Sequence, residues 1–364
     1  MKFIQKNLES IYDKVLNEKR LTFGDGMILA NSNDIHSIGL MANLVRERKN
    51  RNRAFYIINQ HLNYTNVCVN GCKFCAFSKK MDSEETFTIS LEDAIFKIKN
   101  KIPKNVSEIH IVGGLHPELK IDYFEQLFQM LKSEFPNIHL QAFTAVEIFH
   151  IAKISGLSVE DTLKRLLNAG LGSLPGGGAE IFNPEIRKKI CPEKISGEEW
   201  LNVMRTAHKL RIRSNATMLY GHIETPEDCI DHLIKLRDLQ DETGGFMTFI
   251  PLLYHPSNTQ LSIDNEAANS VSGIRDLKQI AIARLMLDNF DHIKAFWIML
   301  GVKLAQVSLS FGADDFDGTV IEEKITHSAG AATPQALTES EIKSLIIEAG
   351  RIPVKRDTLY NILS

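Results

Sequence analysis

Apolar residues recur along this chain with two different spacings. Within residues 1–50, the stretches NLESIYDKVLNEKR and IHSIGLMANLVRERKN carry them at intervals of three and four residues, which predicts amphipathic helices with charged outer faces. Beyond residue 50, short apolar runs of strand length alternate with amphipathic stretches of helix length. This alternation is typical of parallel strands joined by crossover helices, so the pattern predicts an α/β fold.

The alternation can be divided into eight strand–helix repeats. We predict strands at RAFYIIN, EIHIVGG, IHLQAFTAVEI, LGSLPGG, RIRSNATMLYG, FMTFIPLLY and IKAFWIML, and a short one near VSLSFGADD. Eight repeats in a chain of 364 residues favour a closed (β/α)8 barrel of the TIM type over an open doubly wound sheet. Because no Ser- or Pro-rich linker interrupts the series, we expect a single domain, 1–364, with a helical N-terminal segment (1–50) and a barrel (51–364).

Composition and charge narrow the class of partner. The chain is 44% hydrophobic and 24% charged, which is ordinary for a globular protein and argues against disorder. A net charge of -3 gives no global electrostatic reason to bind nucleic acid or an anionic membrane. The first residues, MKFIQKNLESIYDKV, lack the apolar core of a secretory signal, and no run reaches the ~18 apolar residues that span a bilayer. We therefore expect a cytoplasmic protein that acts on small molecules.

Three of the five cysteines lie within the stretch NYTNVCVNGCKFCAFSKK, at Cys68, Cys72 and Cys75. An odd number of cysteines with three clustered does not suit a disulfide framework, whereas thiolates are soft ligands that favour iron–sulfur clusters and zinc. A structural zinc site takes four protein ligands, for which His61 is a possible fourth. Three thiolates on a four-iron cluster would instead leave one iron open to a substrate or cofactor. The spacing favours the cluster, and zinc remains the alternative.

Several other patterns do not indicate a site. Cys191 and Cys229 are isolated in sequence and are predicted to be packing residues, since a lone cysteine behaves as a small hydrophobe. Asp314, Asp315 and Asp317 in GADDFDG do not follow the EF-hand spacing. GLGSLPG departs from the dinucleotide-binding fingerprint, and no P-loop lysine follows PGGG. We therefore do not expect calcium, a nicotinamide cofactor or a phosphate cradle at these segments.

The run CVNGCKFC resembles the cluster signature of the radical S-adenosylmethionine enzymes. The resemblance implies that Cys68, Cys72 and Cys75 hold a 4Fe-4S cluster, whose fourth iron is chelated by the amino and carboxylate groups of S-adenosylmethionine. It also implies that one electron cleaves the sulfonium to give a 5′-deoxyadenosyl radical. Phe74, just before the last cysteine, would lie beside the adenine.

Other segments match further positions of that superfamily. Gly113 and Gly114 end the second predicted strand, where small residues let backbone carbonyls approach the methionine amino group. YGHIETPED, which begins at Tyr220, resembles the segment that packs against adenine. Glu147 and Glu180 are candidates for hydrogen bonds to the ribose hydroxyls or the methionine amino group. The alternatives are tight strand-to-helix turns for the glycines and Tyr220, and salt bridges at the barrel mouth for the two glutamates.

A narrower resemblance extends from about Asn52 to the C-terminus. FTAVEI, GLGSLPGGGAEIF, HPSNTQL, DGTVIEEKITHSAGA and RIPVKRDTLY are similar to the aminodeoxyfutalosine synthase family of menaquinone biosynthesis. The cyclic dehypoxanthinyl futalosine synthases and the F0 synthases share PGGGAEI and stay open as alternatives. The resemblance implies S-adenosylmethionine as a co-substrate, 3-[(1-carboxyvinyl)oxy]benzoate as the second substrate, and an electron donor such as flavodoxin or ferredoxin. A protein that only relays electrons through its cluster is the non-enzymatic alternative.

Residues beyond the predicted strand ends are candidates for substrate binding, because chemistry in such barrels occurs at the carboxyl ends of the strands. His116, His222 and His255 lie there, where an imidazole could hydrogen-bond the substrate or balance its charge, although each could be an ordinary turn residue. The implied substrate has two carboxylates, for which arginine is the best donor. Arg213 in the fifth predicted strand, beside Arg211, is the candidate. The alternative is that Arg213 lies at the strand's entrance, away from the chemistry.

Overall fold

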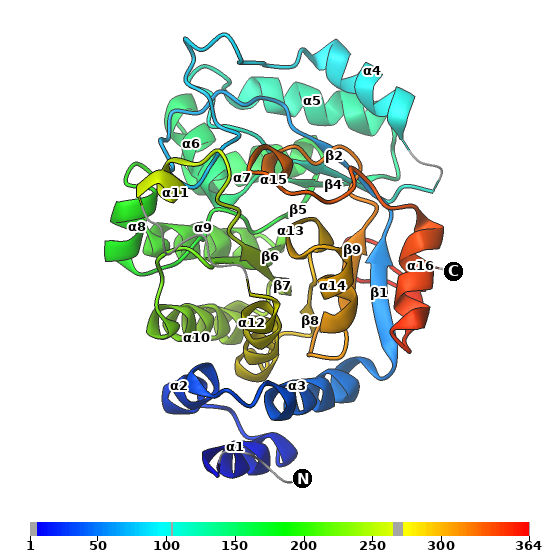
Figure 1. Ribbon diagram of the computed structural model, residues 1–364. Coiled ribbons are helices and arrows are strands. Elements are labelled where there is room, and N and C mark those ends of the chain that lie inside the picture. The colour runs from blue at the N-terminus through cyan, green and yellow to red at the C-terminus, as the bar shows by residue number, and fades with distance from the viewer. Residues whose placement is uncertain (1–5, 103–104, 265–271, 364) are drawn as a thin grey trace.

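The computed structural model describes residues 6–102, 105–264 and 272–363 (Figure 1). Within these residues, parallel strands form a seven-stranded sheet of order β2-β3-β4-β5-β6-β7-β8 and a three-stranded sheet of order β10-β1-β9. The strands are β1 (Arg53–Ile57), β2 (Asn59–Leu62), β3 (Glu108–Ile111), β4 (His139–Ala142), β5 (Leu171–Leu174), β6 (Arg213–Tyr220), β7 (Phe246–Leu253), β8 (His292–Ile293), β9 (Asp315–Gly318) and β10 (Ile352–Lys355).

The two sheets meet on both sides and enclose a barrel. On one side β1 continues into β2 through Ile58, so a single stretch of chain belongs to both sheets. On the other side a parallel bridge pairs Lys294, just after β8, with Asp315 at the start of β9. This closure confirms the expected α/β barrel, in which β1 and β2 together take the place of one strand. The predicted strand RAFYIIN is therefore split, and its second half extends to Leu62.

Helices surround the strands, and many begin at a Ser or Thr that caps the first turn. They are α1 (Asn7–Leu16), α2 (Phe23–Asn31), α3 (Ile35–Asn50), α4 (Leu91–Lys101), α5 (Ile121–Glu134), α6 (Ala145–Ser155), α7 (Val159–Ala169), α8 (Pro184–Ile190), α9 (Gly197–Lys209), α10 (Pro226–Thr243), α11 (Gln260–Asp264), α12 (Gly273–Met286), α13 (Trp297–Leu300), α14 (Val302–Ser308), α15 (Ile325–Ser328) and α16 (Glu339–Glu348). The helix predicted over 35–50 has the expected bounds, whereas α2 was not predicted.

Three predicted strands end earlier or lie elsewhere than expected. IHLQAFTAVEI is a strand only to Ala142, because Phe143 has a positive φ of 63° and Thr144 then caps α6. IKAFWIML contributes only Ile293 to β8 and continues as α13. VSLSFGADD begins with the last two residues of α14, crosses a turn, and reaches β9 only with Asp315. Short apolar runs do not distinguish a buried strand from a buried helix turn, which explains these errors.

The N-terminal helices pack against the outside of the barrel. α3 contacts α12 and α2 contacts α10, and Figure 1 shows α1, α2 and α3 together at the end of the molecule away from α4 and α5. Their buried faces carry apolar residues such as Leu8, Ile11, Leu29, Ile38 and Met41. Within the described residues, no helix combines the length and the apolar character that crossing a membrane requires.

The C-terminal segment closes the barrel at the amino ends of β8 and β9. Arg356 Nε donates to Asp315 Oδ2 (2.6 Å), and both side chains are buried. The Tyr360 ring stacks on His292, with centroids 3.7 Å apart and planes 8° apart. Because this end is filled by side chains, a molecule in the interior is reached from the carboxyl ends of the strands.

Candidate active site

The loop after β2 carries the three clustered cysteines. Cys68, Cys72 and Cys75 are free thiols, each partly exposed, and all three line one cavity of about 320 Å³. A cavity of this size is within the range of small-molecule sites. The backbone N–H of Lys73 donates to the carbonyl of Ile190 (2.8 Å), which ties the middle of the loop to the end of α8.

The donors of this loop fit an iron–sulfur cluster. Burial raises the pKa of the Cys72 thiol to about 12, and the positive charge of Lys194 acts in the opposite direction, toward the thiolate that binds iron. Within the described residues, no three His, Cys, Asp or Glu side chains gather as ligands of a single metal ion. A four-iron cluster has a different requirement, since each thiolate binds a separate iron. Three thiols spaced along one cavity wall suit that requirement.

Two glycines at the end of β3 let the chain pass close to the segment before the cysteines. A β-carbon on Gly114 would lie 2.7 Å from the carbonyl carbon of Val67, and one on Gly113 would lie 2.8 Å from the Tyr64 ring. Real β-carbons do not approach other atoms this closely, so both positions require glycine. The two residues line the cavity beside the cysteine loop, where the sequence placed them.

Glu147 is buried at the cavity wall, and protein donors occupy its carboxylate. Oε1 accepts from Gly113 N–H and from Tyr64 O–H (both 2.9 Å), and Oε2 accepts from Thr144 N–H (2.7 Å) in the capping box of α6. Burial raises the pKa of Glu147, and these hydrogen bonds offset part of that effect. Glu147 therefore joins β3, α6 and the segment before the cysteines, and a role toward S-adenosylmethionine stays a prediction.

Glu180 forms an ion pair with Lys194, a residue that no sequence motif indicated. Lys194 Nζ lies 2.6 Å from Glu180 Oε1 and 5.2 Å from the centroid of the Phe74 ring, and all three residues line the cavity. Although burial lowers it, the charge of Glu180 holds the pKa of Lys194 above its usual value. Lys194 comes from the turn after α8 rather than from a strand end, so no strand-end pattern could have identified it.

The three predicted histidines lie in different surroundings. His255 lines the cavity, with Nε2 2.9 Å from the carbonyl oxygen of Met299. His116 Nδ1 accepts from a backbone N–H two residues further on (3.1 Å), and His222 Nε2 lies 3.1 Å from the Leu219 carbonyl oxygen. The imidazoles of His116 and His222 thus make hydrogen bonds within local turns, and a role of either toward the substrate stays a prediction.

The two ends of β6 hold the remaining candidates. Arg213 is exposed at the amino end, where its guanidinium donates to the Phe246 carbonyl (3.4 Å). The expectation that Arg213 binds substrate is not supported, because it begins the strand and so lies at the opposite end from the cysteine loop. Tyr220 ends the strand and is buried against Asp276 of α12, where burial and Asp276 raise its pKa.

The interior end of the cavity is polar, and only two of its residues stood out in the sequence: His61 as a possible zinc ligand, and Asp317 in a segment where no calcium site was expected. We call the residues that line this end, on or next to β2, β3, β4, β8 and β9, the cavity floor. They are Asn59, His61, Glu108, His110, Gln141, Lys294 and Asp317. Lys294 Nζ donates to Asp317 Oδ1 (2.8 Å), and the His61 and His110 rings are stacked. In β2 and β3 the polar floor residues occur at every second position, a pattern that the sequence shows. Lys294 could not be predicted in the same way, because β8, which precedes it, has only two residues.

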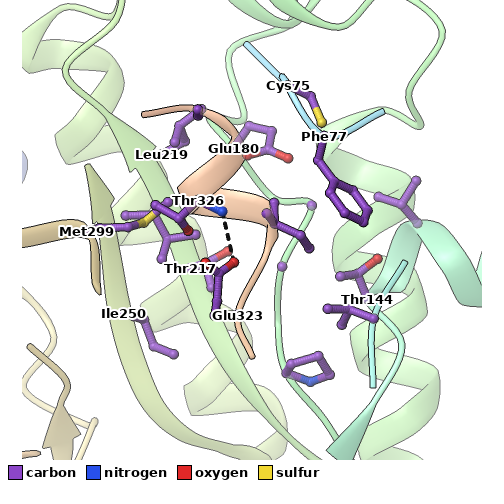
Figure 2. A pocket seen from close by; sticks show the side chains of 18 of the residues that line it. Cys75, Phe77, Thr144, Glu180, Thr217, Leu219, Ile250, Met299, Glu323 and Thr326 are labelled. Carbon is purple, nitrogen blue, oxygen red and sulfur yellow. Dashed lines mark hydrogen bonds between the residues drawn. The ribbon is translucent and has the colours of Figure 1, made fainter. Parts of the chain in front are cut away.

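The segment around α15 forms another wall of the cavity. Figure 2 shows Glu323 and Thr326 from this segment, with Thr326 N–H donating to Glu323 Oε1 (2.9 Å). The His327 imidazole lies 3.1 Å from Glu323 Oε2. His327 lines a second cavity next to the first one, and Phe77 and Glu323 line both cavities. The run DGTVIEEKITHSAGA therefore contributes directly to the site.

Comparisons with known proteins agree with this geometry. Residues 62–236 match the family described as Radical SAM superfamily, and residues 243–364 match the CofH/MqnC C-terminal region. The solved structure of methylornithine synthase (PylB) superposes with a TM-score of 0.74 at 19% identity, covering 94% of this chain and 97% of that chain. This last likeness shows the fold alone.

Two kinds of curated relative are similar over most of the chain. The aminodeoxyfutalosine synthase of Thermus thermophilus is 46% identical over 350 residues, which cover 96% of this chain and 94% of that protein. The 5-amino-6-(D-ribitylamino)uracil–L-tyrosine 4-hydroxyphenyl transferase of Methanopyrus kandleri is 41% identical, covering 84% of this chain and 83% of that protein. The chain is thus similar to enzymes with two different names.

Proposed function

Since this chain belongs to the radical S-adenosylmethionine superfamily, we propose that it joins the adenosyl group of S-adenosylmethionine to 3-[(1-carboxyvinyl)oxy]benzoate, as aminodeoxyfutalosine synthases do in menaquinone biosynthesis. Members of the superfamily are enzymes that use a 4Fe-4S cluster and S-adenosylmethionine. One observation carries the proposal: three free thiols line a barrel cavity whose far end is polar and closed. The preference for this reaction within the superfamily comes from the relatives of that name.

The residues of the cavity have separate tasks in this proposal. Cys68, Cys72 and Cys75 hold the cluster, which when bound supplies the electron that cleaves the sulfonium. The paired charges of Glu180 and Lys194 stand beside the cysteines and suit the ammonium and carboxylate of the methionine moiety. The apolar upper walls and the closed floor exclude water from a reactive carbon radical.

The proposed reaction consumes S-adenosylmethionine. The 5′ carbon forms a bond with the terminal vinyl carbon of the enol ether, and the aryl group migrates from oxygen to the neighbouring carbon. Cleavage of the bond between the sulfonium sulfur and the 5′ carbon releases methionine. After the aryl migration, loss of the carboxylate as carbon dioxide leaves the aryl ketone aminodeoxyfutalosine and gives back one electron, which balances the electron supplied at the start. A low-potential protein such as flavodoxin or ferredoxin would supply the initial electron.

A second candidate is transfer of the 4-hydroxyphenyl group of tyrosine. It is favoured by the archaeal relatives of that name, which are 38–41% identical to this chain. Both candidate reactions place an aryl substrate in the barrel and differ in the acceptor. A cyclic dehypoxanthinyl futalosine synthase or F0-synthase-like activity would share the cysteines and differ in the substrate.

One anaerobic assay distinguishes these activities. The reconstituted enzyme is given dithionite, S-adenosylmethionine and 3-[(1-carboxyvinyl)oxy]benzoate, and the products are analysed by mass spectrometry. We expect a product that contains both the adenosyl carbon skeleton and the aryl group. Free 5′-deoxyadenosine with no such product would contradict the proposal. A parallel reaction with tyrosine and 5-amino-6-(D-ribitylamino)uracil then tests the second candidate.

A further inference from the structure

Strand register arranges the cavity floor in two levels. His61 pairs with His110, and His110 pairs with Gln141, so these three side chains share one level of the barrel interior. Asn59 pairs with Glu108 two residues earlier, one level closer to the closed end. A ligand that enters from the carboxyl ends of the strands therefore meets the two imidazoles before it meets Glu108.

His61 has hydrogen-bonding capacity that the protein does not use. Its side chain stacks on His110, with centroids 4.4 Å apart and planes 15° apart, and the residue is only 6% exposed. Within the described residues, its backbone N–H donates to Ile321 but its ring nitrogens make no hydrogen bond. Buried polar groups normally have a partner, so an imidazole on a cavity wall is suited to meet one on a ligand.

The charges around this imidazole determine which ligand fits. Glu108 is buried, and although burial raises its pKa, His110 and the charges of Lys294 and Arg356 hold that pKa well below its usual range. Lys294 is already paired with Asp317 (2.8 Å). The floor thus contains two carboxylates and one ammonium, so a ligand carboxylate would add a third negative charge to a buried site.

A proton on His61 removes this conflict. Without a ligand, burial and His110 lower the pKa of His61, so the ring is neutral. A carboxylate in contact with the ring would raise that pKa, because an opposite charge nearby favours the protonated form. Lys294 keeps two further N–H donors beyond its bond to Asp317, and its charge is close enough to act on His61.

Resting on the proposed function, which supplies an aromatic substrate with two carboxylates, we propose that His61, stacked on His110 beside Lys294, binds one of these carboxylates at the cavity floor and takes up a proton as it does so. The aryl ring then lies above the floor, toward the cysteines. Specificity for an acidic aryl substrate comes from the imidazole rather than from an arginine.

The proposal can be tested by calorimetry on the cluster-loaded enzyme with S-adenosylmethionine bound. The probes are 3-methoxybenzoate and 3-methoxybenzamide, which have similar shapes and differ in charge. We expect the benzoate to bind about tenfold more tightly than the benzamide, because a hydrogen bond to a charged group is stronger. Titrations in two buffers of different ionisation enthalpy should show uptake of about one proton per benzoate.

Variants of His61 separate the contribution of its imidazole to binding from that of the other residues of the cavity floor. His61→Asn should remove both the preference for the benzoate and the proton uptake, while iron content and S-adenosylmethionine binding stay unchanged. His36→Asn, on the exposed surface of α3, is the matched control and should behave as the wild type. His61→Gln serves as the second variant if His61→Asn does not fold.

The outcomes distinguish this proposal from the proposed function. Equal binding of the two probes by the wild type, no proton uptake, or a preference that survives in both His61 variants would overturn the role of His61. Failure of the enol ether to give an adduct would instead overturn the proposed function. An adduct formed by His61→Asn with an unchanged KM would contradict the floor site alone.

Discussion

Lys194 Nζ lies 2.6 Å from Glu180 Oε1 in an ion pair whose side chains are 13% and 7% exposed. Glu180 precedes α8 in the chain and Lys194 follows it, and both residues line the same cavity as Cys72. A buried ion pair is costly to form, because both charges lose water. Because the pair lines the same cavity as the three thiols, we expect it to act in the site.

Removing one charge of this pair should be strongly destabilising. Lys194→Met leaves Glu180 buried without a partner, at a cost of about 3 kcal/mol in the free energy of unfolding. The double variant Glu180→Gln/Lys194→Met should regain most of that loss and still fail to bind S-adenosylmethionine. Denaturant unfolding of the apoprotein and calorimetry with S-adenosylmethionine measure the two effects.

The control for this prediction is an exposed lysine in a similar pair. Lys235 lies 2.7 Å from Asp231 on α10, with both side chains more than 40% exposed. Lys235→Met should change the free energy of unfolding by about 0.5 kcal/mol at most. If the double variant loses as much free energy of unfolding as the Glu180 and Lys194 single variants lose together, the two charges do not stabilise each other and the prediction is wrong.

Gly114→Ala should prevent the cysteine loop from reaching its observed position. The added methyl group would overlap the backbone of Val67, which is not a flexible side chain and cannot move aside. We expect iron content to fall several-fold after reconstitution. Gly24→Ala in α2 is the control, since its β-carbon would lie 3.8 Å from the nearest atom, the hydroxyl oxygen of Thr22. Normal iron binding by Gly114→Ala would show that the loop adapts.

How far the sequence predicts the site depends on whether the signal is local. Cys72 and Gly114 belong to short motifs next to strand ends, so their approximate positions follow from the order of the strands. Lys194 follows a helix, and Lys294 follows a strand of only two residues, so neither stands out by spacing. Arg213 lies at the strand's entrance, the alternative that the direction of the strand left open, because its residue type matched the implied substrate but its position in the strand did not.

The fold, like the site, is predictable where the sequence signal is local and less predictable where distant contacts decide. The repeat of strands and helices predicts a barrel because each repeat is visible in the periodicity. The last quarter was less predictable, since the buried Trp297 lies in a short helix and its Nε1 donates to the Gly318 carbonyl (2.9 Å). Contacts between residues far apart in the chain decide such segments, and a single sequence does not reveal them.

Cys72→Ala and Cys191→Ala should differ sharply in iron content. Cys72 lines the cavity, whereas Cys191 is buried at the end of α8 and close enough to Cys72 to influence its pKa. We expect Cys72→Ala to lose the cluster and all turnover, and Cys191→Ala to keep both with a stability loss of about 1 kcal/mol. Iron analysis and visible absorption after anaerobic reconstitution measure this. Equal loss in both variants would mean that Cys191 also ligates iron.

The Glu323–His327 contact should make the α15 segment sensitive to pH. Their hydrogen bond raises the pKa of His327 to about 9, above the value of about 6.5 in an unfolded chain. Because the folded-state pKa is the higher one, the stabilisation is fully present below about pH 6.5 and is lost as the pH rises through about 9. His327→Gln keeps a donor for Glu323 but does not titrate in this range. The difference in Tm between the wild type and His327→Gln should therefore shrink between these pH values, and a difference that stays constant would show that the pair does not contribute.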